Sequence, residues 1–115
     1  MYTELLDCTL GEALVKPHRS YLPVVQAIRA QTRIKGMAHI TGGGFIDNLP
    51  RILPSGLGAV VDRNAWEVPA LFQLIEREGH VAHDEMYRVF NMGIGLVIVV
   101  SPLDAEHVLR AAGEG

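Results

Sequence analysis

The sequence predicts an α+β domain in which helices cover a mixed β-sheet. Its 115 residues suffice for one domain with a hydrophobic core and are few for two, so residues 1–115 are treated as a single domain. Segments rich in apolar and β-branched residues alternate with segments whose apolar residues recur at helical spacing. Proline, glycine and capping residues fall at the boundaries. These patterns predict helices interleaved with strands, with helices over at least one face of the sheet.

Composition and charge describe an ordinary globular protein. Hydrophobic residues make up 49% of the chain, charged residues 20%, and the net charge is −3. Because no cluster of five or more Lys and Arg residues occurs, no nucleic-acid partner is expected. The single cysteine, Cys8, excludes an intrachain disulfide and favours a cytoplasmic setting. The longest apolar run, residues 94–100, is far below the roughly 20 residues of a membrane span, so no membrane partner is expected.

The first elements are bounded by start and stop signals. Thr9 and Glu12 have the capping-box spacing, in which a hydroxyl and a carboxylate satisfy free amides at a helix start. Pro17 ends that short helix. Apolar residues at helical spacing predict a second helix over residues 21–32. Residues 36–41 then form a predicted strand, which the following glycines break.

The later elements follow the same logic. The sequence predicts a helical turn over residues 45–49, a strand over 57–62, helices over 69–79 and 83–90, a strand over 91–100 and a helix over 101–112. Pro69 suits a first helical turn and Gly79 a helix end, and Ser101 is the expected cap ahead of Pro102. About three strands form a narrow sheet for this many helices. Either further strands come from elsewhere or the sequence is part of a longer chain.

Gly42, Gly43 and Gly44 stand between a predicted strand and a predicted helix. Such a loop can present several N–H groups to an anion at the positive end of a helix dipole, and it can equally be a tight turn. Neither the GxGxxG fingerprint nor a P-loop motif is present. Spacing alone therefore leaves phosphate binding and a packing turn open. Residues 91–93 similarly predict a close backbone approach, either to a ligand or to a neighbouring strand.

Polar side chains near the glycines each have two interpretations. His39 ends the strand, where it either contacts a ligand held by the loop or bonds to the backbone as a boundary histidine, the commoner situation for a lone histidine. Thr41 and Asn48 either face the same pocket or simply suit a strand and a turn. The candidate anion ligands, each with an alternative as a surface residue, are Arg19, Arg51 and Arg88.

The remaining polar groups form no metal or nucleophile motif. His80 and His83 lie close to Asp84 and Glu85 in sequence, but the His-Glu-x-x-His pattern is missing, so no metal site is predicted. Cys8 has no histidine nearby in sequence and is interpreted as a spare thiol. No general base is identified.

Four motifs occur in order along the chain: LVKPHRSY at residues 14–21, GMAHITGGGF at 36–45, NLPRILP at 48–54 and EMYRVFNMGIG at 85–95. Together they resemble phosphoribosylformylglycinamidine cyclo-ligase, also called aminoimidazole ribonucleotide synthetase. The resemblance extends from about residue 10 to residue 115. It corresponds to the C-terminal part of the family's longer two-domain polypeptide.

The resemblance implies a reaction and separate roles for the two domains of the family's polypeptide. The reaction is ATP-dependent ring closure of formylglycinamidine ribonucleotide to aminoimidazole ribonucleotide in purine biosynthesis. The implied fold is a three-layer C-terminal domain that lacks its final strands. In this family the N-terminal domain, absent here, supplies most of the ATP and magnesium site and the homodimer contact. The chain alone is then expected to be inactive and to hold no cofactor.

The same resemblance carries a ligand-binding role to particular residues. The main candidates are His39, Thr41, Gly42, Gly43 and Gly44, and the further candidates are Asn48, Arg19 and Asn91. Assigning the glycine loop to the substrate's 5′-phosphate is a hypothesis.

Two other functions stay open. One is another enzyme of the same superfamily, which includes formylglycinamidine ribonucleotide synthetase, thiamine-phosphate kinase, selenophosphate synthetase and a hydrogenase-maturation protein. The other is a non-catalytic module that binds phosphate or docks on another protein through an unpaired sheet edge.

Overall fold

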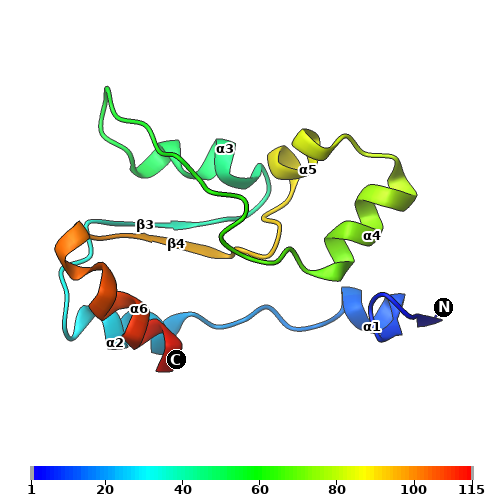
Figure 1. The fold of residues 1–115 in the computed structure, drawn as a ribbon, viewed down its shortest axis with the longest axis horizontal. Helices are drawn as coiled ribbons and strands as arrows, with labels where there is room; N and C mark the ends of the chain where they lie inside the picture. The colour runs from blue at the N-terminus through cyan, green and yellow to red at the C-terminus, as the bar shows by residue number, and fades with distance from the viewer. Residues whose placement is uncertain (1, 115) are drawn as a thin grey trace.

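The computed structural model describes residues 2–114. In chain order its elements are β1 (Tyr2–Thr3), β2 (Cys8–Thr9), α1 (Leu10–Leu14), α2 (Leu22–Arg29), β3 (Gly36–His39), α3 (Gly44–Asn48), η1 (Pro50–Ile52), α4 (Ala70–Gly79), α5 (His83–Val89), β4 (Leu96–Val99), η2 (Pro102–Asp104) and α6 (Ala105–Glu114). Strands β3 and β4 lie in the middle, with α3 and α5 on one side and α2 and α6 on the other (Figure 1). The predicted α+β class is confirmed, and helices cover both faces of the central sheet.

The central sheet is an antiparallel pair. Gly36 of β3 lies opposite Val99 of β4, and His39 lies opposite Leu96. The Ile40 N–H continues the ladder by donating to the Gly95 carbonyl oxygen at 2.8 Å. The short strands β1 and β2 also pair antiparallel. Over residues 2–114 the predicted mixed sheet is therefore two separate antiparallel pairs.

The sheet divides the hydrophobic interior into two clusters. Ala38, Ile40 and Val97 pack into the larger cluster together with α3 and α5, where Met86 is fully buried. Ile98 points the other way and packs against α2 and α6. Successive residues of a strand face opposite sides of its sheet, so neighbouring residues of β4 serve different clusters.

Several predicted element ends are confirmed. The Glu12 N–H donates to Thr9 Oγ1 at 3.1 Å and the Thr9 N–H donates to Glu12 Oε2 at 3.0 Å, which completes the capping box. Pro69 precedes α4, and the helix ends at Gly79. His80 takes the left-handed conformation after it, with φ of 52°.

The predicted strand over residues 57–62 is wrong. The segment is a loop, and all of residues 54–65 are exposed. Gly56, with φ of 84°, turns the chain so that the Leu57 N–H donates to the Pro54 carbonyl oxygen at 3.1 Å. Its apolar residues favour an extended conformation, but a strand also needs a neighbour to satisfy its N–H and C=O groups. Strands β3 and β4 pair with each other, and these groups face water instead.

The C-terminal helical segment begins differently from the expectation. The side chain of Ser101 makes no capping hydrogen bond; its carbonyl oxygen instead accepts the Asp104 N–H at 2.9 Å, which starts the 3₁₀ turn η2. Pro102 occupies the first turn, as predicted. Helix α6 follows, and it is ten residues long, as is α4. Within residues 2–114 no helix has the length and apolar character needed to cross a membrane.

Replacing Met86 by alanine tests the larger cluster. We expect the free energy of unfolding to fall by about 2–5 kcal/mol, because the lost side chain leaves a cavity. The matched control is Leu109→Ala, at a side chain on α6 that is 72% exposed, and it should change the free energy by less than about 0.5 kcal/mol. Urea unfolding followed by circular dichroism measures both. Equal losses for the two variants would contradict the assignment of the core.

Candidate functional site

A cavity of about 400 Å³ opens where the end of β3 meets the end of α5. The residues that line it are His18, His39, Ile40, Thr41, Gly42, Phe72, Val89, Phe90 and Asn91. Four of the predicted ligand-binding residues are among them, namely His39, Thr41, Gly42 and Asn91. The fold therefore brings three motifs that are distant in sequence, residues 14–21, 36–45 and 85–95, to one cavity.

Asn48 holds the glycine loop in shape. Its side chain is 3% exposed, and its amide N–H₂ donates to the carbonyl oxygens of Gly44 at 2.7 Å and of Thr41 and Gly42 at 3.3 Å. Its Oδ1 accepts a hydrogen bond from the Thr41 hydroxyl at 3.3 Å and one from Arg51 at 3.4 Å. Both polar groups of the side chain form hydrogen bonds within the protein, and Asn48 does not line the cavity. Asn48 therefore supports the shape of the loop.

Two of the three glycines are required by the turn itself. Gly44, with φ of 59°, lies so close to the carbonyl oxygens of Tyr87 and Phe90 that a Cβ atom has no room there. Gly43 has φ of 94°, and its N–H donates to the Val89 carbonyl oxygen at 3.4 Å. Left-handed conformations of this kind favour glycine strongly. The glycines therefore form the tight turn that was one of the two interpretations of their spacing.

Gly42 differs from its neighbours. A Cβ atom added at Gly42 meets nothing within 4 Å, and the residue lines the cavity. The Gly44 N–H is used by the Thr41 carbonyl oxygen at 3.0 Å, whereas the Gly42 N–H has no partner among the described residues. Of the three glycine amides, that of Gly42 is the one left without a partner among the described residues.

His18 also lines the cavity, although the sequence did not predict it as a ligand-binding residue. Its ring lies perpendicular to that of His39, with centroids 5.4 Å apart and an interplanar angle of 89°. The Nδ1–H of His18 donates to the Arg19 carbonyl oxygen at 2.8 Å, which leaves Nε2 for a ligand. The available signal was its place inside the first family motif, one residue before the predicted Arg19.

The predicted candidates Arg19 and Asn91 have different surroundings. Arg19 is not among the lining residues, and its guanidinium carbon lies 5.8 Å from the Tyr21 ring centroid. Asn91 lines the cavity while its Oδ1 accepts the Gly93 N–H at 2.9 Å. Gly93, with φ of 99°, lies directly against the ring of Pro69. The close approach in this segment is therefore to the proline that precedes α4, and not to the neighbouring strand that the sequence analysis offered as one alternative.

His83 and Asp84, neighbours at the start of α5, pair with different side chains. His83 Nδ1 lies 2.8 Å from Glu76 Oε1, whereas Asp84 Oδ1 accepts a hydrogen bond from Arg63 at 2.9 Å. Within residues 2–114 no group of three or more His, Cys, Asp or Glu side chains is placed to hold a metal ion. The hydrogen bond from Arg63, reinforced by its charge, holds the pKa of Asp84 below its usual range.

Comparison with known proteins defines the family of this chain. The family described as "AIR synthase related protein, C-terminal domain" matches residues 3–115, so the chain belongs to this family. It is 53% identical, over 98% of its length, to phosphoribosylformylglycinamidine cyclo-ligase of Desulfitobacterium hafniense. The proteins of the same name from Geobacillus thermodenitrificans and Alkaliphilus metalliredigens are 52% identical over 93% of the chain and 45% identical over 98%. The chain spans about a third of the length of these relatives, with values of 34%, 31% and 33%.

Alanine at two positions of the glycine loop, Gly42 and Gly44, should have unequal consequences for stability. Gly44→Ala should lower the free energy of unfolding by about 2–4 kcal/mol, because the new methyl group meets two backbone carbonyls and the conformation is left-handed. Gly42→Ala should change it by less than about 0.5 kcal/mol, because the space there is open. Thermal unfolding by calorimetry compares them, and a Gly42→Ala protein as unstable as Gly44→Ala would contradict this description of the loop.

Replacing Arg63 by glutamine should raise the pKa of Asp84 toward its ordinary value, because the main cause of the lowered pKa is removed. The folded protein binds this proton less tightly than the unfolded chain does. The ion pair therefore stabilises the fold above the usual carboxyl pKa, and that contribution is lost as the pH falls through the lowered pKa. NMR titration of the Asp84 carboxyl carbon measures the change; an unaltered midpoint in the variant would contradict it.

Proposed function

We propose that the chain is the C-terminal, substrate-cleft part of a phosphoribosylformylglycinamidine cyclo-ligase. The complete enzyme would use ATP to convert formylglycinamidine ribonucleotide into aminoimidazole ribonucleotide in cytoplasmic purine synthesis. The observation that carries the proposal is the convergence of His39, Thr41, Gly42 and Asn91 on one cavity, in a chain 53% identical to a protein of that name. Every one of these four residues lies in a motif on which the family resemblance rests.

The cavity suits a phosphorylated, partly apolar ligand. The Gly42 N–H and the two imidazoles of His18 and His39 are donors of the kind that bind a phosphate oxygen. Phe72 and Phe90, with ring centroids 5.8 Å apart, supply an apolar wall that excludes water. We assign the 5′-phosphate of the ribonucleotide to the Gly42 side of the cavity.

The proposed chemistry is ring closure in two steps. The γ-phosphoryl group of ATP moves to the formyl oxygen of the substrate. The amidine-side nitrogen then loses a proton and forms a bond to the same carbon, and the carbon–oxygen bond breaks to release phosphate. Such a reaction depends mainly on positioning and charge stabilisation. The part proposed for this chain is to bind and orient the ribonucleotide.

We assign the ATP site and the dimer contact to the rest of the longer polypeptide. Magnesium that accompanies ATP is held by the phosphates together with one or two carboxylates. We assign those carboxylates to the same part of the polypeptide as the ATP site. This division is consistent with the chain spanning about a third of its relatives.

Replacing His39 by alanine should weaken ribonucleotide binding roughly 10- to 100-fold, because a hydrogen bond to a charged phosphate is lost. Isothermal titration calorimetry of the 115-residue chain with formylglycinamidine ribonucleotide measures this. The matched control is His107→Ala, at an exposed histidine on α6, which should bind like the original chain. ATP titrated alone should give no heat of binding. Equal affinity of the His39 and His107 variants would contradict the assignment, and absence of ribonucleotide binding by the original chain would refute the proposed function for it.

A further inference from the structure

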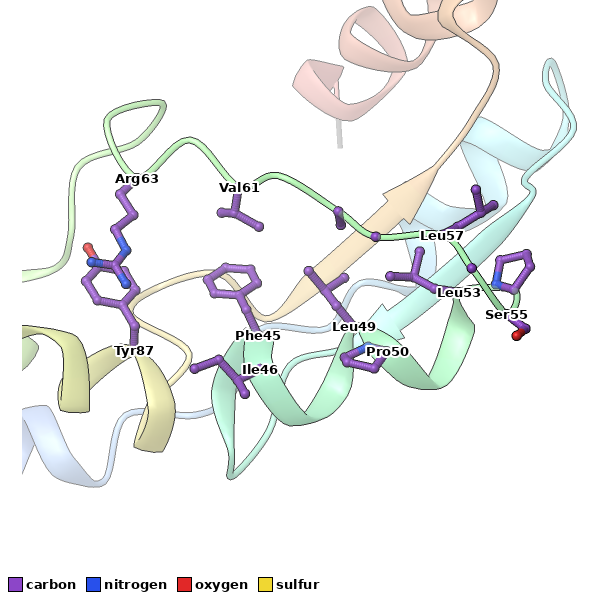
Figure 2. A pocket seen from close by; sticks show the side chains of 14 residues that line it. Phe45, Ile46, Leu49, Pro50, Leu53, Ser55, Leu57, Val61, Arg63 and Tyr87 are labelled. Carbon is purple, nitrogen blue, oxygen red and sulfur yellow. The ribbon is translucent and has the colours of Figure 1, made fainter.

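A second and larger cavity, of about 570 Å³, lies beside α3 and η1. Its outer wall is the strap, defined as residues 54–63. In Figure 2 the strap crosses above α3, with Val61 over Phe45 and with Leu57 near Leu53. None of the residues that line this second cavity also lines the cavity at the end of β3, hereafter the ribonucleotide cavity.

The strap is held mainly at its two ends. At its start, the tight turn at Gly56 is closed by the hydrogen bond from Leu57 to Pro54. Between residues 58 and 61 no backbone hydrogen bond is formed with any described residue. Beyond its end, the Trp66 indole N–H donates to the Met92 carbonyl oxygen at 3.0 Å. Segments with exposed residues and few hydrogen bonds open readily, so the end contacts determine where the strap lies.

Arg63 makes two contacts with the same helix. Its guanidinium carbon lies 4.0 Å from the centroid of the Tyr87 ring, and its NH1 nitrogen lies 2.9 Å from Asp84 Oδ1. Figure 2 shows the guanidinium group stacked over the Tyr87 ring. Tyr87 is buried and belongs to the larger hydrophobic cluster. One side chain thus joins the strap to α5 through a cation–π contact and an ion pair.

The same turn of α5 supports the glycine loop. The carbonyl oxygens of Tyr87 and Phe90 lie against Gly44, and the Val89 carbonyl oxygen accepts the Gly43 N–H at 3.4 Å. Val89 and Phe90 also line the ribonucleotide cavity. Tyr87 therefore presents its ring to Arg63 and its carbonyl group to the glycine loop.

We propose that Arg63 is a positioning residue for the glycine loop, acting through Tyr87 and Asp84 on α5. It contacts no part of the ribonucleotide cavity itself. By holding the C-terminal turn of α5 in place, Arg63 positions the Val89 carbonyl oxygen that accepts the Gly43 N–H. It also positions Val89 and Phe90, which form part of the cavity wall. The inference deepens the proposed function, because the loop it positions is the proposed phosphate side of the site.

Amide hydrogen exchange on the 115-residue chain tests the positioning role without any ligand. In Arg63→Gln the Gly43 amide should exchange roughly fivefold faster or more, because the carbonyl it bonds to loses its support. The Ile40 amide, bonded to Gly95 in the sheet, should keep its rate. The control Arg77→Gln removes an exposed ion pair on α4 and should change neither amide. If Arg63→Gln is poorly folded, Asp84→Asn, which keeps the stacking, should shift Gly43 in the same direction by less.

Two results would overturn the inference: an unchanged Gly43 amide, or equal acceleration at Gly43 and Ile40, which would mean general destabilisation only. Calorimetric titration with formylglycinamidine ribonucleotide adds a functional arm, in which Arg63→Gln should bind several-fold more weakly than Arg77→Gln. If the original chain binds no ribonucleotide, the proposed function fails for it while the exchange rates still decide the role of Arg63. If it binds and Arg63→Gln binds equally well, the positioning role is refuted.

Discussion

The shape of the site depends on the hydrogen bonds that the buried side chain of Asn48 makes with the glycine loop. A segment with three consecutive glycines has more conformational freedom than any other stretch of the chain, and ordering it costs entropy. The amide of Asn48 offsets that cost by donating to three carbonyl groups of the loop at once. Its oxygen meanwhile accepts hydrogen bonds from Thr41 and Arg51. Because buried polar groups are costly when unpaired, this arrangement favours one loop shape over many.

Backbone contact between the loop and α5 is the second constraint. Gly44 lies against the carbonyl oxygens of Tyr87 in that helix and of Phe90, the residue that follows it, and Gly43 donates to the Val89 carbonyl oxygen. A contact between main chains leaves no flexible side chain to absorb a displacement, so a shift of α5 moves the loop with it. The helix in turn contacts the strap through Arg63. The short helix α5 therefore links the cavity beside α3 to the cavity at the end of β3.

These constraints separate the glycines by role. Gly43 and Gly44 make the turn possible, whereas Gly42 lines the cavity and has an open space and a free N–H among the described residues. The adjacent His18 and His39 rings add donors at the same place. The loop thus forms its turn with two glycines and leaves the third as a candidate anion contact. A role of the loop in positioning a ligand is consistent with the proposed ring closure, which depends mainly on the orientation of the reacting groups.

The sequence by itself determined the local features: the class of fold, the ends of α4 and the capping box, and the grouping of His39 with the glycines in one motif. These depend on backbone preferences and on the period of apolar residues, which act over a few residues. Only the tertiary structure decided that residues 57–62 lie unpaired as part of the strap, and that His18, not Arg19, reaches the cavity. It also decided that Asn48 supports the loop from within. Pairing, burial and hydrogen-bond satisfaction depend on which distant segments become neighbours, and short-range patterns carry no record of that.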